Sequence, residues 1–425
     1  MSATTRRVGA AMVAAAAAAA VVAAPTQAQA AAPAGQDVSS AAHFIADAIA
    51  ANTDHLMTPP GTFGQFPDVG NTIDAVLGLG QAGAGGDVSA VAVTWLKGQA
   101  PSYTSFVDTW SGPEPVTVVM GGATGKLATL AAARGEDPSA FGGVDLPGQL
   151  MGLIDASTGR FGTAANDFDL TVNQAWGVLG LARTTGSAAD LDLTVGFLLA
   201  QQCDDGGFRA NMAADGCVSD VDATAYAVQA IIAADRPSSY GRGLDGADWL
   251  QDVQEADGSF VNASGEGANA NSTALAAQAF TAAGNAARAE SARAFIRTLQ
   301  WGCAATETNR GGIAFTAATV AETEENVYKA ERATTQALLA LAGGSLVAVQ
   351  AGAQTPGTVA MSCTQAVTPP TETTAPAPAA TTPTTRGIGA NTDAEVEPSW
   401  LLPSVALAGI VVTGTALLRR RSATS

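Results

Sequence analysis

Histidine is scarce in this chain of 425 residues, which contains only His43 and His55. Two histidines near the start argue against a histidine-rich metal site and against a Ser-His-Asp hydrolase with a late histidine. Basic residues are also few: 20 lysines and arginines stand against 38 aspartates and glutamates, a net charge of −18. Because nucleic-acid binding needs basic patches that neutralise phosphate, we expect no nucleic-acid partner. Aromatic residues make up 5% of the chain, few for a protein that surrounds a large planar or cationic ligand with rings.

The N-terminus has the three parts of a secretory signal peptide. Arg6 and Arg7 precede an alanine- and valine-rich run, and small residues follow up to Ala30. A basic start, an apolar middle and a small-x-small exit predict cleavage after Ala30, so residues 1–30 are the expected signal peptide. The paired arginines leave the general secretory and twin-arginine export routes both open.

The C-terminus predicts a membrane anchor in residues 400–425. Trp400 is followed by 18 residues without a charge and then by three arginines, 419–421. Such a helix would be ~27 Å long at ~1.5 Å per residue, enough to cross the hydrocarbon core. Terminal arginines favour the cytoplasmic side, so we expect a single-pass protein of the cell membrane with its body outside the cell.

Residues 364–399 are rich in proline, threonine and alanine and cannot bury a core, which predicts an extended spacer. The body between the two ends carries 15 basic and 38 acidic residues, a net charge of −23. Strong self-repulsion keeps such a body soluble and disfavours anionic partners.

Export would place all four cysteines in an oxidising compartment. Cys203 and Cys217 are close enough in the sequence to close one loop, which would leave Cys303 to pair with Cys363. Four cysteines allow three pairings, and only proximity along the chain favours this one.

Repeats of about 50 residues organise residues 31–363. The pattern Gly-x-Phe occurs four times, and a degenerate copy follows: Gly64-Gln65-Phe66, Gly159-Arg160-Phe161, Gly206-Gly207-Phe208, Gly258-Ser259-Phe260 and Gly311-Gly312-Ile313. The first interval spans two periods, so we place the missing copy at Gly121-Gly122. The chain therefore predicts six repeats.

Each repeat predicts a helical hairpin with a glycine-containing turn. The second helix opens near a threonine that can cap it, and it is apolar nearly all round, as a helix buried on every side would be. The six threonines are Thr72, Thr124, Thr171, Thr224, Thr273 and Thr335. Because no strand-like alternation of any length is present, the sequence predicts an all-α fold.

The segments from Phe197 to Phe208 and from Ser219 to Ala225 resemble the prenyltransferase and squalene-oxidase repeat, and Trp249 to Phe260 is a second good copy. This resemblance covers roughly residues 41–344. It implies a single (α/α)6 toroid, the fold of terpenoid cyclases, with six inner helices around a central funnel and six outer ones.

Within this family, the run from Asp220 to Ala225 is similar to the D-x-D-D-T-A motif of class II terpene cyclases, whose middle aspartate donates a proton. The resemblance assigns that role to Asp222, but Ala223 replaces the neighbouring acid that would help to tune it. Acidic D-x-D stretches also cap helices and favour the helix dipole without catalysing anything. Aromatic residues that steady carbocations are few on the inner helices, mainly Trp176, Tyr226 and Phe280.

Other proteins with this toroid match the chain less well. Protein prenyltransferases hold zinc with a late histidine, and complement-like thioester domains need a Gly-Cys-x-Glu-Gln motif; neither feature is present. Transcobalamin-like carriers hold a corrinoid between one toroid and a small β domain, and no segment here predicts that domain. We expect no metal ion and no other cofactor.

The sequence therefore favours a non-enzymatic module on the cell surface that binds an unknown small molecule or an extracellular protein. The alternative is a degenerate or unusual class II terpene cyclase-like enzyme that uses Asp222 as its acid. Gln229 and Gln278 lie five residues after equivalent threonines, and Asp74, Asn173 and Tyr226 lie two residues after theirs. The candidate ligand-binding residues are Asp74, Asn173, Trp176, Asp220, Tyr226, Gln229 and Gln278.

The two apolar ends generate a first prediction. Protease added to intact cells should release the body and leave a stub that contains residues 400–425, because we expect only the anchor to lie in the membrane. The measurement is immunoblotting of the cell fraction with tags at both ends of the mature chain. Protection of the whole body from the protease would contradict the assigned orientation.

Overall fold

The computed structural model describes residues 36–61, 64–109, 112–184, 186–262 and 267–363. The predicted signal peptide (1–30), spacer (364–399) and membrane anchor (400–425) lie outside the described residues. Within the described ranges, no helix is long and apolar enough to cross a membrane.

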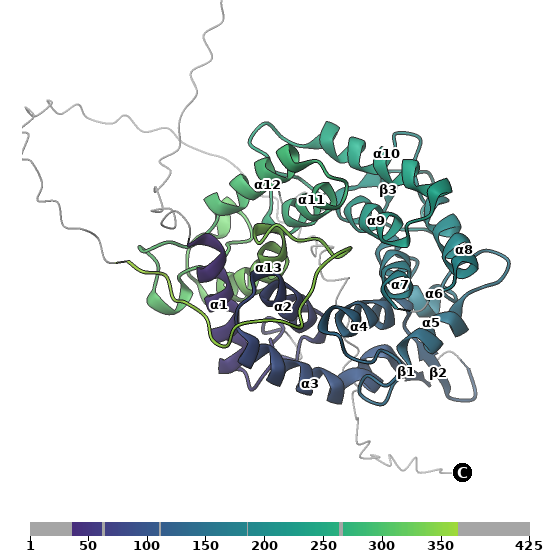
Figure 1. The fold of residues 1–425 in the computed structure, drawn as a ribbon, viewed down its shortest axis with the longest axis horizontal. Helices are drawn as coiled ribbons and strands as arrows, with labels where there is room; N and C mark the ends of the chain where they lie inside the picture. Colours follow the sequence, from purple (N-terminus) through teal and green to yellow (C-terminus); the bar gives the residue numbers. More distant parts are fainter. Residues whose placement is uncertain (1–35, 62–63, 110–111, 185, 263–266, 364–425) are drawn as a thin grey trace, which may run out of the picture.

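Twelve helices form two concentric rings (Figure 1). Consecutive inner helices contact each other, and the last inner helix packs against the first, so the inner ring is closed. The inner helices are α2 (Val69–Ala82), α4 (Gly121–Arg134), α7 (Thr171–Arg183), α9 (Val221–Ala234), α11 (Ala270–Ala282) and α13 (Glu324–Leu341). The outer helices are α1 (Asp37–Ala51), α3 (Gly86–Thr104), α5 (Leu146–Leu153), α8 (Ala188–Leu199), α10 (Pro237–Val253) and α12 (Ala286–Thr298).

The inner helices α2, α4, α7, α9 and α11 are apolar nearly all round because each one is packed on every side. In α9, 12 of the 14 residues are buried, among them two polar ones, Thr224 and Gln229. Small residues allow the closest contact in the ring, between α4 and α7. A Cβ atom on Gly180 would lie 2.7 Å from the Cα atom of Gly125, so alanine cannot replace this glycine without moving the backbone.

One glutamine side chain links each of three consecutive hairpins to the next one. In each case the Nε2 atom donates to the carbonyl oxygen of the turn glycine and to a carbonyl oxygen of the following outer helix, at 2.8–3.2 Å. The three sets are Gln202 with Gly206 and Arg242, Gln254 with Gly258 and Arg288, and Gln300 with Gly311 and Asp37. Because Asp37 belongs to α1, the last of these sets closes the outer ring.

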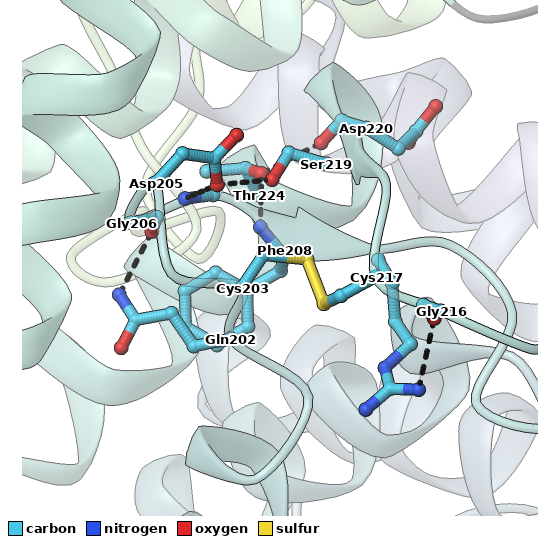
Figure 2. Close-up of a disulfide and its surroundings, with 12 residues drawn as sticks. Gln202, Cys203, Asp205, Gly206, Phe208, Gly216, Cys217, Ser219, Asp220 and Thr224 are labelled. Carbon is cyan, nitrogen blue, oxygen red and sulfur yellow. Dashed lines mark hydrogen bonds between the residues drawn. A yellow bond between two sulfur atoms is a disulfide. The ribbon is translucent and has the colours of Figure 1, made fainter.

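In four repeats a threonine hydroxyl joins the turn to its inner helix. In the fourth repeat, Thr224 Oγ1 accepts from the Phe208 backbone N–H at 2.8 Å and donates to the Asp220 carbonyl at 2.6 Å (Figure 2). In four further repeats a side-chain oxygen accepts a hydrogen bond from the equivalent backbone N–H of the turn. Thr72 accepts from Leu56, Gln174 from Phe161, Thr273 from Phe260 and Thr334 from Ile313. We call these residues, with Thr124 in the second repeat, the clamp residues.

The sequence indicated that these threonines could cap the inner helices. In the structure other residues are the caps. The caps of α2, α9 and α11 are Asp68, Asp220 and Asn269, whose side chains accept from a backbone N–H three residues later. The clamp residue lies one turn further into the helix. Helix α7 begins at Thr171, as predicted, but its clamp residue is Gln174. In α13 the clamp residue is Thr334, and the prediction that Thr335 opens this helix was wrong because Thr335 lies in its interior.

Two turn assignments were also wrong. Gly121 and Gly122 begin α4, and a hairpin of β1 (Ser105–Asp108) and β2 (Val116–Val119) takes the place of the turn. The fold is therefore mostly helical but not entirely so, because β-branched residues in this segment pair as strands. A second, shorter pair consists of β3 (Phe208–Arg209) and β4 (Ser219–Asp220), and α6 (Ala164–Asp167) is a single turn.

In the first repeat the buried turn position belongs to Leu56 rather than to Phe66 of the Gly-x-Phe pattern. Phe66 is 37% exposed, whereas Leu56 is buried and donates its N–H to Thr72. Asp54 adopts the left-handed conformation that glycine adopts in the other turns, with φ of 72°. Gly159, Gly206, Gly258 and Gly311 have φ between 84° and 95°.

Residues 343–363, which we call the strap, cross one end of the ring (Figure 1). Both expected disulfides are present, and Cys303–Cys363 attaches the end of the strap to the sixth repeat. Cys203–Cys217 closes the loop between the fourth turn and α9 (Figure 2).

The clamp generates a second prediction. Thr224→Val keeps the side-chain shape but leaves the buried Phe208 N–H without its acceptor, so the free energy of unfolding should fall by about 1–3 kcal/mol. Urea denaturation followed by circular dichroism measures it. Thr298→Val on the exposed face of α12 is the control and should change the value by less than about 0.5 kcal/mol. Equal effects of the two changes would refute the clamp.

A candidate binding site at the centre of the ring

The two ends of the inner ring differ. At the C-terminal ends of the inner helices, Arg183 donates to the carbonyl oxygens of Leu346, Val347 and Val349 in the strap at 2.6–3.0 Å. Gln229 Oε1 accepts from the Leu346 N–H at 2.8 Å. The strap therefore covers this end, and the N-terminal ends of the inner helices surround the other.

At the centre, each inner helix contributes the residue two positions after its clamp residue. These six residues are Asp74, Lys126, Trp176, Tyr226, Leu275 and Gln336. Five of them line one cavity, and the sixth, Lys126, contacts two of the five. The repeats thus place six different side chains at one level of the ring.

A chain of contacts runs through half of this level. The Lys126 ammonium lies 2.8 Å from Asp74 Oδ2 and 5.2 Å from the centre of the Trp176 ring. Trp176 in turn contacts Tyr226, with ring centroids 5.3 Å apart. Burial raises the pKa of Asp74, although Lys126 opposes this. Burial and the nearby carboxylates of Asp74 and Asp222 raise the pKa of Tyr226 well above its usual value, so the phenol stays protonated.

The cavity is small and has two kinds of wall. Its volume is about 10 Å³, room for about one water molecule, between Leu77, Leu275, Leu339 and Leu346 on one part of its surface and polar side chains on the rest. Gln278 is 2% exposed and Gln336 is partly buried, and the Oε1 atoms of both lack a hydrogen-bond partner in the described part of the chain. Gln278 is held in place because its Nε2 donates to the Gln336 carbonyl at 3.0 Å.

The two acids of the D-x-D stretch have different environments. Asp220 caps α9, since its Oδ1 accepts from the Ala223 N–H at 2.8 Å. Asp222 does not cap: its Oδ1 is buried and has no partner among the described residues. Burial and the nearby negative charge of Asp220 raise the pKa of Asp222 to about 7, although hydrogen bonds from the Ser272 and Asn262 side chains act to lower it. Asp222 is therefore partly protonated at neutral pH.

The predicted ligand-binding residues do not all lie at the cavity. Asp74, Trp176, Tyr226 and Gln278 line the cavity. Gln229 lies at the covered end, and Asp220 is a cap. Asn173 does not share a level with Asp74 and Tyr226, because Gln174 rather than Thr171 is the clamp residue of α7; its Nδ2 donates to the Asp167 carbonyl.

Sequence reasoning missed Lys126, Asn271, Gln336 and Glu331. Lys126 lies two residues after Thr124, so the repeat spacing could have found it. Gln336 and Asn271 could be identified only from the register of α13 and the orientation of α11, which the sequence does not show. Glu331 has a buried Oε2 without a partner in the described part of the chain, and burial raises its pKa to about 7.

Within the described ranges, no group of three or more histidine, cysteine, aspartate or glutamate residues could hold a metal ion.

No protein-family model matches the chain, and no curated protein matches it. Solved structures do resemble it. The ent-copalyl diphosphate synthase from Streptomyces platensis is 17% identical, with a TM-score of 0.43 over 66% of this chain and 52% of that one. The chain thus spans about half the length of that enzyme.

Two further structures are glycosidases. A glycosyl hydrolase of family 88 from Bacteroides vulgatus is 10% identical, with a TM-score of 0.48 over 72% of this chain and 99% of that one. An unsaturated glucuronyl hydrolase specific for heparin is 10% identical, with a TM-score of 0.49 over 71% and 96%. At such identities and scores no function transfers, and the resemblance to the prenyltransferase repeat stays a prediction.

Asp222 generates a third prediction. Its pKa of about 7 in the folded state lies above the value of ~3.9 in an unfolded chain. The folded state thus binds more protons between these values, and the contribution of Asp222 to stability falls as pH rises through that window. Asp222→Asn cannot ionise, so its unfolding free energy relative to the native protein should increase from about pH 4 to pH 7 and then level off.

Urea denaturation at a series of pH values measures this difference. Asp204→Asn, which alters an exposed acid in the turn of the same repeat, is the matched control. A flat difference for Asp222→Asn would show that the carboxyl group titrates normally.

Proposed function

We propose that the toroid is a non-enzymatic ligand-binding module carried outside the cell on a membrane-anchored chain. The observation that carries this proposal is the central cavity, which the strap covers at one end and which is lined by buried polar atoms that have no partner among the described residues. Buried polar groups are usually satisfied, and those that are not point to a bound molecule or ordered water.

The cavity is small in this conformation. Ligand pockets usually measure ~300–1,000 Å³, whereas this cavity of about 10 Å³ has room for about one water molecule. A long polyprenyl chain would not fit unless the inner helices or the strap moved. A small molecule would also need the inner helices or the strap to move, but by less than a polyprenyl chain would.

A second candidate function is acid catalysis by Asp222, the role that class II terpene cyclases give to this aspartate. It is favoured by the raised pKa of this carboxyl group, because a general acid works best with a pKa close to the working pH. Tyr226 borders the cavity and lies one turn beyond Asp222 on the same face of α9. Asp222 is therefore about one helical turn from the cavity wall to which it would deliver a proton. The size of the cavity weighs against a polyprenyl substrate.

The test separates binding from catalysis. Native mass spectrometry of the purified body, residues 31–363, should reveal a co-purified small molecule that is lost on denaturation. The same protein incubated with linear polyprenyl substrates should yield no cyclic product by gas chromatography and mass spectrometry. Cyclic products that disappear in Asp222→Asn, with the fold intact, would establish the second candidate and refute the first.

A further inference from the structure

Six segments surround the N-terminal ends of the inner helices, at the end of the ring that the strap does not cross. Each joins an outer helix to the following inner helix, and they are residues 52–68, 105–120, 154–170, 200–220, 254–269 and 299–323. We call the described residues of these segments the rim. The Asn166 side chain donates to the Val119 carbonyl at 2.8 Å, and the Met212 N–H donates to the Asp169 carbonyl at 2.7 Å. The second, third and fourth segments therefore form one connected surface.

Large hydrophobic side chains are exposed on the rim. Six of the eleven that are exposed in the described part of the chain lie there: Phe66, Val107, Val116, Phe168, Val218 and Val261. Four of these six belong to the connected second, third and fourth segments. At the other end, the segments that join inner to outer helices and the strap have one within the described ranges, Val359. Apolar side chains gathered on one face are typical of an interaction site.

Phe168, in the third segment, is held in an unusual backbone conformation. Its φ is 53° and that of Asp169 is 56°, in the left-handed region that bulky residues seldom adopt. Arg160 braces this turn, because its guanidinium group donates to Asp167 at 2.7 Å and to Asp169 at 2.6 Å. The Phe168 side chain is nevertheless 42% exposed, so burial of the ring does not compensate for the strain. Strained residues that the surrounding structure holds in place are concentrated at functional sites.

The rim is strongly acidic. Its described residues include 15 acidic and three basic ones, a net charge of −12. The described segments at the other end, with the strap, include four acidic residues and one basic residue, a net charge of −3. A partner of the rim must therefore bring positive charge. A second copy of this chain would bring the same negative charge, and anionic lipid surfaces would also be repelled.

We propose that the rim is the docking surface for a second protein, whose contact surface has apolar side chains surrounded by lysines and arginines. Phe168 would lie at the centre of the contact, with Val116 and Val218 from the two neighbouring segments beside it. An aromatic residue in a rigid setting is a typical centre of a protein interface, and charged residues typically lie around it. The rim is separate from the central cavity, so this inference goes beyond the proposed ligand binding.

The experiment uses the full chain, purified in a neutral detergent, and short synthetic peptides that form amphipathic helices. The first peptide contains leucine and lysine. In the second, serine replaces leucine, and in the third, glutamate replaces lysine. Fluorescence anisotropy should show that the leucine–lysine peptide binds about tenfold tighter, or more, than either of the others, because the rim is both apolar and acidic.

Paired variants locate the contact. Phe168→Ser should weaken binding of the leucine–lysine peptide about fivefold or more, and Val218→Ser serves if Phe168→Ser does not fold. The control Val359→Ser removes an equally apolar, exposed side chain from the strap and should leave the affinity unchanged. Asp215→Lys on the rim should also weaken binding, whereas Asp137→Lys at the other end changes the net charge equally and should have little effect.

Three results would overturn the docking surface. They are equal binding of the leucine–lysine and serine–lysine peptides, equal effects of the rim variants and their controls, and no binding of any peptide. Hydrogen exchange distinguishes a lipid partner: transfer of the full chain without peptide from detergent to phosphatidylcholine vesicles should leave exchange of the rim amides unchanged. Protection of the rim by the vesicles would make the membrane the partner instead. Because the variants lie outside the cavity, these results leave the proposed ligand binding to its own test.

Discussion

The rest of the structure depends on one interaction, the pair of hydrogen bonds by which a glutamine side chain links a turn to the next outer helix. An inner helix that is apolar all round cannot face water, so the ring is stable only when every inner helix has neighbours on both sides. Gln202 and Gln254 make this link inside the chain, and Gln300 makes it between the sixth repeat and α1. The first and last hairpins, more than 250 residues apart, are thus joined by the same bond as adjacent ones.

Closure of the ring explains the electrostatics of its centre. Side chains at the inner level are removed from water by six helices and, at one end, by the strap. A carboxyl group there must find a cation, find hydrogen-bond donors or become protonated. Asp74 has Lys126, and Asp220 has the N–H groups of a helix start. Asp222 has no cation, and its pKa is raised to about 7. Closure of the ring therefore both stabilises the fold and raises the pKa of this acid.

The strap has a second effect on the site. It occupies the end of the ring opposite to the N-termini of the inner helices, and Leu346 forms part of the cavity wall. Arg134 and Arg183 at the ends of two inner helices bind its carbonyl groups, which directs both cations away from the polar centre. The centre is left with one paired lysine and several buried oxygen atoms that have no partner among the described residues, which underlies the proposed binding function.

From the sequence alone, the spacing of the turns predicted six repeats and a helical hairpin as the repeating unit. Proximity along the chain favoured the two disulfides that are present without excluding the other pairings. The sequence could not determine register. Thr171 and Gln174 are both polar residues near the start of α7, and only the contact with the Phe161 N–H shows that Gln174 is the clamp. An error of three residues moved Asn173 onto the central level, where Trp176 lies. Likewise, Lys126 and Asp74 are 52 residues apart in sequence and meet only because their helices are neighbours in a closed ring. The tertiary structure decided which side chains face the centre, since that depends on the rotation of each helix, and a rotation is set by packing from all sides.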